Sequence, residues 1–177
     1  MNQVQEAGRV LLFTGDGKGK TTAALGMALR ACGHGLRVLM VQFIKAAPTG
    51  EAAAARWLQG FELLQTGRGF VPRPDSPQFE EHRRAAVKGL EQAAQALASG
   101  RYELVILDEI CSAVSTGLLG EENVVALVEQ RPPALTLVLT GRGATARLLA
   151  LADTVTEMTC VKHAFESGRK AQKGVEF

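Results

Sequence analysis

The sequence Thr14-Gly15-Asp16-Gly17-Lys18-Gly19-Lys20-Thr21-Thr22 lies between a short apolar run, Val10–Phe13, and a segment predicted to be helical, Ala23–Arg30. A strand, a glycine-rich turn and Gly-Lys-Thr at the start of a helix form the context that a phosphate-binding loop requires. Glycines let backbone N–H groups turn inward, and the positive end of the helix dipole favours an anion. This stretch is therefore predicted to bind the phosphate chain of a nucleotide.

The side chains of this loop have distinct expected roles. Lys20 is predicted to reach the phosphates as a point charge, and the hydroxyl of Thr21 is predicted to ligate Mg²⁺. Lys18 adds a second cation, and Thr14 stands where the usual pattern has glycine. The residues of the loop expected to bind the nucleotide are Gly15, Asp16, Gly17, Lys18, Gly19, Lys20, Thr21 and Thr22.

Length and composition are those of an ordinary globular protein. The 177 residues, 46% hydrophobic and 21% charged, predict a single domain over 1–177. A net charge of +2 with one Trp and one Tyr gives no reason to expect nucleic acid or a membrane as partner. The three cysteines are far apart and lack metal-ligand spacing. Residues 1–8 are polar and do not resemble a signal peptide, so the cytoplasm is the expected location.

Apolar and amphipathic segments alternate along the chain. Strands are predicted at Val10–Phe13, Val38–Ile44, Phe61–Gln65, Tyr102–Glu109, Leu135–Leu139 and Thr154–Cys160. Helices are predicted at Ala23–Arg30, Ala52–Gln59, Ser76–Ala98 with Ser76 as N-cap, Glu121–Gln130 and Thr145–Ala152. This alternation predicts an α/β fold of the P-loop, RecA-like type, with a mostly parallel sheet covered by helices on both faces.

Four charged residues lie at the ends of predicted strands or shortly after them, at the edge where a parallel sheet binds its ligands. The pair Asp108-Glu109 closes an apolar strand, and an acidic residue there can hold Mg²⁺; the alternative is a solvated strand end. Side-chain alternation puts the two carboxylates on opposite faces, so we expect only one of them to do this. Lys45 and Arg142 are expected to contact the nucleotide from the same rim, although both also fit a surface position.

The three histidines and the single tryptophan are not expected to take part in catalysis. His34, His82 and His163 lie in different segments without a Ser or Cys partner at motif spacing, so each is expected to be structural or exposed. Trp57 is expected to pack against the core from a short helix.

Further motifs occur in order along the chain: VQFIK at 41–45, GE at 50–51, TGRGF at 66–70, VILDE at 105–109, TGRG at 140–143, ADTVTEM at 152–158 and KHAFESGRKAQKGVEF at 162–177. Together with TGDGKGKTTAALGMALRACGHG at 14–35, this set resembles the ATP:corrinoid adenosyltransferases, a bacterial family that adenosylates cobalamin and its precursors. The resemblance covers about Gly8 to Phe177, and the family form of the loop also has Thr in its first place.

The resemblance implies transfer of the 5′-deoxyadenosyl group from ATP to a Co(I) corrinoid, with release of triphosphate. It further implies that ATP binds in a reversed orientation, which exposes the ribose C5′ to the cobalt. Co(I) is itself a strong nucleophile, so no protein base is needed. Lys20 is then a catalytic residue that stabilises the leaving triphosphate together with Lys18, and Thr21 and Glu109 are the expected Mg²⁺ contacts.

The resemblance also implies a role for an aromatic residue in the segment 67–72. In the family, such a residue displaces the lower ligand of cobalt and makes Co(II) easier to reduce. Phe70 matches one such aromatic and is the second expected catalytic residue, whereas Pro72 stands where many relatives carry tryptophan. An unidentified reductase for cobalt and a homodimer are implied in the same way.

Two other functions share the predicted fold. A RecA-like ATPase acting on nucleic acid would use the same sheet and loop, but the near-neutral charge and scarce aromatic residues count against it. A non-catalytic carrier or sensor of adenosylcobalamin would bind without turnover, and the intact Gly19-Lys20-Thr21 and Glu109 count against it.

Overall fold

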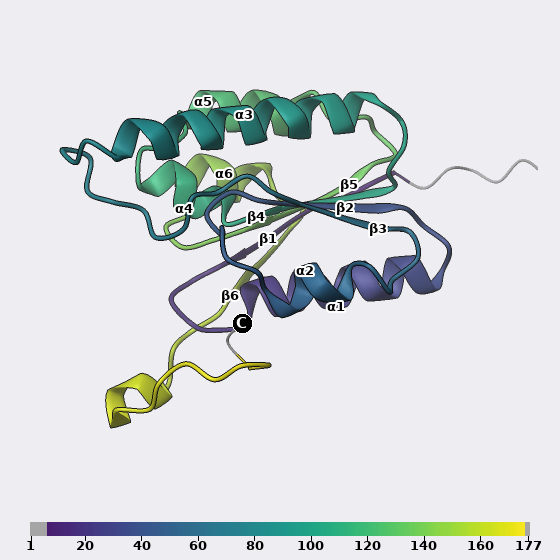
Figure 1. The fold of residues 1–177 in the computed structure, drawn as a ribbon. Helices are drawn as coiled ribbons and strands as arrows, with labels where there is room; N and C mark the ends of the chain where they lie inside the picture. Colours follow the sequence, from purple (N-terminus) through teal and green to yellow (C-terminus); the bar gives the residue numbers. More distant parts are fainter. Residues whose placement is uncertain (1–6, 176–177) are drawn as a thin grey trace, which may run out of the picture.

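The computed structural model describes residues 7–175, which contain one six-stranded sheet with helices on both faces (Figure 1). Every pair of neighbouring strands is parallel, in the order β3-β2-β4-β5-β1-β6. The strands are β1 (Val10–Thr14), β2 (Val38–Gln42), β3 (Phe61–Gln65), β4 (Leu104–Asp108), β5 (Thr136–Thr140) and β6 (Thr154–Glu157). The predicted α/β class with a parallel sheet is confirmed.

The helices divide between the two faces of the sheet. The elements are α1 (Lys20–Gly33), α2 (Gly50–Ala54), α3 (Phe79–Ala98), α4 (Ile110–Ser115), α5 (Glu121–Glu129), α6 (Ala146–Leu151) and a short 3₁₀ helix, η1 (Ala164–Ser167). Figure 1 shows α1 and α2 below the sheet and α3 to α6 above it. A parallel sheet covered in this way buries both faces of its central strands, which explains their uninterrupted apolar sequences.

Each central strand contributes side chains to two separate cores. Leu39 and Val41 of β2 belong to the core beneath α3 and α5, whereas Val38 and Met40 belong to the core that α1 covers. The alternation of side chains along a strand produces this division. β6 forms one edge of the sheet, and all four of its residues are exposed.

Several predicted bounds differ in the structure: β2 ends at Gln42 and not at Ile44, β6 ends at Glu157 and not at Cys160, and α2 is shifted toward the N-terminus. Three further predictions about elements are wrong. Ser76 is not the N-cap of α3, because its carbonyl accepts the N–H of Phe79 in a separate turn and the helix begins only after Gln78. The fourth strand ends at Asp108, one residue earlier than expected, because α4 begins directly after Glu109 and was not predicted. Trp57 does not pack against the core; α2 ends at Ala54, and the indole lies beyond it with 89% of its surface exposed.

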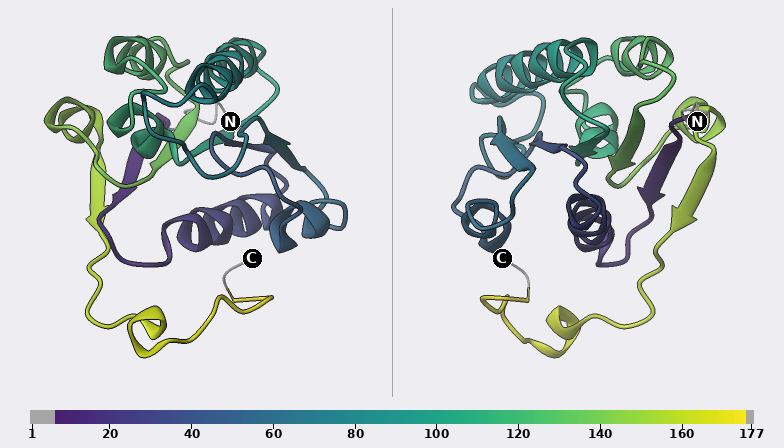
Figure 2. Two further views of the ribbon diagram at one scale, coloured as in Figure 1. Left: turned by 60° about the vertical axis from the view of Figure 1, so that its left-hand side comes forward. Right: turned by 90° about the vertical axis from the view of Figure 1, so that its right-hand side faces the viewer.

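The chain after β6 runs underneath the helices of the lower face. Figure 2 shows this C-terminal segment passing below α1 and ending near α2. Residues 1–6, expected to be polar and to lack a signal peptide, lie outside the described residues. Within residues 7–175, none of the helices has both the length and the apolar character needed to cross a membrane.

Candidate functional site

A pocket of about 1060 Å³ opens at the edge of the sheet where the strands end. Its walls come from the loop after β1, helices α1, α2 and α4, the residues that follow β2, β3, β4 and β5, and the C-terminal segment. The predicted site residues that line it are Gly17, Lys18, Gly19, Lys20, Thr21, Thr22, Lys45, Phe70, Glu109 and Arg142. The fold therefore brings most of the predicted site residues to one cavity.

The phosphate-binding loop contains glycines that no other residue could replace without strain or collision. Gly15 and Gly19 have φ values of 90° and 117°, in the region that side chains disfavour. A Cβ on Gly15 or Gly17 would lie 2.5 or 2.6 Å from the carbonyl oxygen of Met158. The N–H of Gly17 donates to that oxygen at 2.6 Å. The loop therefore packs directly against the chain that follows β6.

Lys20 is the first residue of α1, and its side chain points back into the phosphate-binding loop. Its ammonium donates to the carbonyl oxygens of Gly15 at 2.6 Å and Gly17 at 2.7 Å. Burial lowers the pKa of Lys20, and the negative charge of Glu109 partly opposes this effect. A buried cation surrounded by loop backbone is suited to an anionic ligand at this position.

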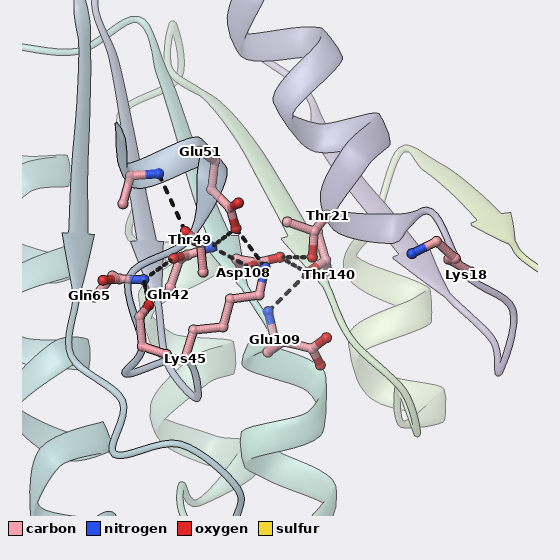
Figure 3. Close-up of polar contacts among 12 residues, drawn as sticks. Lys18, Thr21, Gln42, Lys45, Thr49, Glu51, Gln65, Asp108, Glu109 and Thr140 are labelled. Atoms are coloured by element: carbon pink, nitrogen blue, oxygen red, sulfur yellow. Dashed lines mark hydrogen bonds and ion pairs between the residues drawn. The ribbon is translucent and has the colours of Figure 1, made fainter. Parts of the chain in front are cut away.

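Asp108 is the carboxylate that contacts the loop, although sequence analysis gave it no separate role (Figure 3). Its Oδ1 accepts hydrogen bonds from the hydroxyls of Thr21 and Thr140, both at 2.8 Å. Its Oδ2 accepts one from Gln42 Nε2 at 3.1 Å and lies 3.6 Å from Lys45 Nζ. The position of Asp108 at the end of an apolar strand indicates a site residue in the sequence. The contact between Asp108 and Thr21 could not be predicted from the sequence, because the two residues are far apart in the chain.

Glu109 follows in an unusual backbone conformation. Its φ of 63° makes it the one non-glycine residue in the left-handed region among the residues described. Its N–H donates to Thr140 Oγ1 at 2.9 Å, and its Oε2 accepts a hydrogen bond from Ser112. Glu109 lines the pocket, whereas Asp108 is completely buried behind it. The two carboxylates therefore occupy different positions, and the expected difference in their roles stays a prediction.

Lys45 and Glu51 form an ion pair opposite the loop. Lys45 Nζ lies 2.8 Å from Glu51 Oε1, and the same oxygen accepts a hydrogen bond from Gln42 Nε2 at 3.1 Å. Burial would lower the pKa of Lys45, but the charge of Asp108 and the hydrogen bond to Glu51 raise it overall. Gln65 in turn donates to Gln42 Oε1 at 2.9 Å. These contacts join the ends of β2, β3 and β4 into one network.

Arg142 closes the loop from the other side. Its guanidinium donates to the carbonyl oxygen of Asp16 at 3.2 Å, and its N–H donates to Ser112 Oγ at 2.9 Å. Lys18 instead faces the C-terminal segment, where its ammonium donates to the carbonyl oxygen of Val175 at 3.0 Å. Arg142 therefore lies at the rim, as the sequence predicted.

Phe70 lies at the pocket with 97% of its surface exposed. The loop that carries it is fixed at Gly67, where a Cβ would lie 2.1 Å from the backbone of Ile44. An aromatic ring with so little burial contributes little to the core, and its predicted contact with the corrinoid stays a prediction.

The C-terminal segment supplies another wall of the pocket, which sequence analysis did not predict. His163, Gly174 and Val175 line the cavity, and His163 Nδ1 accepts a hydrogen bond from the N–H of Phe165 at 3.2 Å. His163 was expected to be structural or exposed; it caps η1 and also lies at the site.

Comparison with known proteins gives consistent results. The profile of the family described as "ATP:corrinoid adenosyltransferase BtuR/CobO/CobP" matches residues 6–177. The chain is 45% identical over 174 residues to a corrinoid adenosyltransferase of Pseudomonas aeruginosa, with 97% of this chain and 85% of the relative aligned. It is 42% identical over 173 residues to one of Escherichia coli K12, covering 97% and 87%. It is 40% identical over 174 residues to the corrinoid adenosyltransferase CobA of Salmonella typhimurium, covering 98% and 87%.

Proposed function

The chain belongs to the ATP:corrinoid adenosyltransferase family, and we propose that it transfers the 5′-deoxyadenosyl group of ATP to the Co(I) of a corrinoid, releasing triphosphate. The observation that carries this proposal is one cavity with a phosphate-binding loop on one side and the exposed ring of Phe70 at its mouth. A nucleotide held by the loop and a flat macrocycle placed against Phe70 would share this cavity.

In the proposed reaction the Co(I) electron pair attacks C5′, and the C5′–O bond breaks with its electrons remaining on the triphosphate. The protein has to hold C5′ near cobalt and stabilise the charge of the leaving group. Lys20 and the N–H groups of the loop are the residues for the second task, and Arg142 is placed to assist at the rim. Lys18 donates to the carbonyl oxygen of Val175 in the C-terminal segment. We expect its positive charge to help stabilise the leaving triphosphate.

Thr21 and Glu109 are the residues that would hold Mg²⁺. The hydroxyl proton of Thr21 is donated to Asp108, so the lone pairs of its oxygen remain for a cation. Glu109 offers a carboxylate in the same pocket. Mg²⁺ prefers such oxygen ligands and takes further ones from phosphates, where it would neutralise developing negative charge.

The expected electron donor follows from the chemistry of the reaction, and the expected homodimer from the family resemblance. Making Co(I) requires an external electron donor, which we expect to be a reductase in the cytoplasm. We expect Phe70 to make this reduction easier by displacing the lower ligand of cobalt, which leaves four-coordinate Co(II). We also expect a homodimer, for which sedimentation equilibrium would give twice the 18.8 kDa mass of the chain.

The test is an anaerobic assay with Co(I) cobalamin, ATP and Mg²⁺, followed through the absorption change of the new cobalt–carbon bond. We expect turnover with release of triphosphate. Release of ADP and phosphate stimulated by DNA would instead identify an ATPase acting on nucleic acid, and binding without turnover would identify a carrier.

Replacing Lys20 by Ala tests the role of the loop. We expect kcat to fall by about 10²-fold or more, with weaker ATP binding, because the leaving triphosphate loses its buried cation. Lys88→Ala, which removes an exposed lysine on α3, is the matched control. A Lys20→Ala variant with full turnover and ATP affinity would refute this assignment.

A further inference from the structure

Two hydroxyl groups fix Glu109 at opposite ends of the residue. Its N–H donates to Thr140 Oγ1 at 2.9 Å, while its backbone is left-handed with a φ of 63° (Figure 3). At the far end, the hydroxyl of Ser112 in α4 donates to the carboxylate oxygen Oε2. A glutamate side chain has three rotatable bonds, and a hydrogen bond at its tip restricts all of them. The carboxylate of Glu109 is therefore held in place before any ligand arrives.

The hydroxyl of Ser112 also contacts the turn that follows β5. Ser112 Oγ accepts the N–H of Arg142 at 2.9 Å. A Cβ on Gly141 would lie 2.6 Å from the backbone nitrogen of Ser112 and 2.9 Å from its Oγ, so this turn lies directly against α4. The side chain of Ser112 is buried at the wall of the pocket. One hydroxyl therefore fixes the position of the Glu109 carboxylate relative to the turn that carries Arg142.

The hydrogen bond from Ser112 uses only one oxygen of Glu109. None of the residues that the structure describes donates a hydrogen bond to the other oxygen, Oε1. Among residues 7–175, no group of three or more His, Cys, Asp and Glu side chains is arranged to hold a metal ion. A divalent cation that enters with a nucleotide would therefore depend on few protein ligands, with phosphates supplying others. Its affinity should be sensitive to how firmly the Glu109 carboxylate is held.

We propose that Ser112 is a positioning residue, whose hydroxyl holds Glu109 so that one carboxylate oxygen stays available to the Mg²⁺ that accompanies ATP. Ser112 acts through Glu109 and not through a contact of its own with the cation. Groups that hydrogen-bond to metal ligands fix the orientation of those ligands, and their loss commonly weakens metal binding by about 10- to 100-fold. This inference rests on the proposed function, because it assumes that ATP enters this pocket with Mg²⁺.

The test measures how much Mg²⁺ strengthens the binding of ATP. Calorimetry without corrinoid gives the Kd of ATP in EDTA and the Kd of ATP in saturating Mg²⁺, and the ratio of these two values is the metal gain. Ser112→Ala should reduce the metal gain by about tenfold. A purely structural role of Ser112 would weaken ATP binding equally with and without Mg²⁺ and would leave the metal gain unchanged, which would overturn the proposal.

A double-mutant cycle with Glu109→Ala tests whether Ser112 acts through Glu109. Glu109→Ala should itself lower the metal gain, because it removes the carboxylate. In the Glu109→Ala background, Ser112→Ala should lower the metal gain by less than about twofold more, since the group that Ser112 holds is already absent. A tenfold effect of Ser112→Ala in both backgrounds would show that Ser112 acts independently of Glu109, which contradicts the proposal.

Ser115→Ala is the matched control on the same helix. The hydroxyl of Ser115 donates to the carbonyl oxygens of Ser112 at 3.2 Å and Arg142 at 3.4 Å, and not to Glu109. This variant should keep the wild-type metal gain, and urea unfolding should show that each variant is folded. If Ser112→Ala does not fold, Ser112→Cys replaces it, because a thiol of similar size is a weaker donor. Its metal gain should fall by several-fold, and an unchanged gain would overturn the proposal.

Failure of this proposal is distinguishable from failure of the proposed function. The metal gain is measured without corrinoid, so it does not require adenosyl transfer. If the wild type binds ATP but transfers no adenosyl group to Co(I) cobalamin, the proposed function fails while the metal gain still tests Ser112. If Mg²⁺ does not strengthen ATP binding by the wild type, the role of Ser112 is refuted whether or not the transfer takes place.

Discussion

Asp108 and Glu109 are adjacent carboxylates with entirely different surroundings. Asp108 is the last residue of β4, is completely buried and accepts hydrogen bonds from the side chains of Thr21, Gln42 and Thr140. Glu109 leaves the strand through a left-handed conformation, which costs about 1 kcal/mol or more and places its carboxylate at the pocket. Consecutive residues therefore take different positions: Asp108 accepts a hydrogen bond from Thr21, and Glu109 lines the pocket.

At the same scale, Phe70→Ala tests the ring at the mouth of the pocket. Because Phe70 is exposed, the substitution should change the free energy of unfolding by less than about 0.5 kcal/mol. Adenosylation that starts from Co(II) under mild reduction should fall by about tenfold or more, and adenosylation of pre-reduced Co(I) should fall much less. Both rates are measured in the anaerobic absorption assay.

Phe165→Ala is the control for this prediction, since Phe165 is exposed on η1 and does not line the pocket. Equal losses with Co(II) and Co(I) substrates in Phe70→Ala would mean that the ring contributes only to binding.

Among the elements, α3 depends on a close approach at Gly89. A Cβ there would lie 2.4 Å from Thr66 Oγ1 and 3.3 Å from the ring of Phe43. Gly89→Ala should therefore destabilise the protein by about 1–3 kcal/mol, because overpacking outweighs the gain in helix propensity. In α1, Gly26 has nothing within 4 Å of the same position, so Gly26→Ala should stabilise by about 0.5–1 kcal/mol. Urea unfolding of both variants measures this difference, and a stabilised Gly89→Ala would contradict it.

The C-terminal segment is an element of the site rather than of the core. Residues 159–175 are exposed apart from His163, and His163, Gly174 and Val175 line the pocket. A chain that ends at Thr159 keeps the contact of Met158 with Gly17 and should unfold near the wild-type urea midpoint. Its KM for ATP should rise several-fold because one wall is missing. An unchanged KM would show that this wall does not contact substrate.

For the molecule as a whole, Glu51 gives stability a defined pH dependence. The pKa of Glu51 in the folded state is lowered from 4.5, so its contribution is complete above that value and is lost as pH falls through the folded pKa. The pKa of Lys45 is raised from 10.5, so its contribution persists until the pH exceeds the folded value. The difference in free energy of unfolding between wild type and Glu51→Gln should therefore be largest near neutral pH and should shrink below about pH 4. Urea titrations at pH values from roughly 3 to 7 measure this difference, and a difference that grows in acid would contradict the expected sign.

The sequence alone determined the parallel α/β fold, the phosphate-binding loop and the family resemblance. These features are local, because apolar runs, glycine spacing and short motifs report on neighbouring residues. Helix α4 was missed because its start depends on Glu109 adopting a conformation that non-glycine residues seldom adopt. Trp57 was misplaced because the end of α2 at Ala54 leaves no helix to carry it inward.

Only the tertiary structure decided which side chains meet. A parallel sheet brings strand ends that are distant in sequence to one edge, so Thr21, Gln42 and Asp108 become neighbours across 87 residues of chain. The same folding joins Lys18 to Val175 and leaves one oxygen of Glu51 without a side-chain donor from Lys45 or Gln42. Such contacts depend on the register between strands and on the path of the last segment. Neither of these can be predicted from a short stretch of sequence.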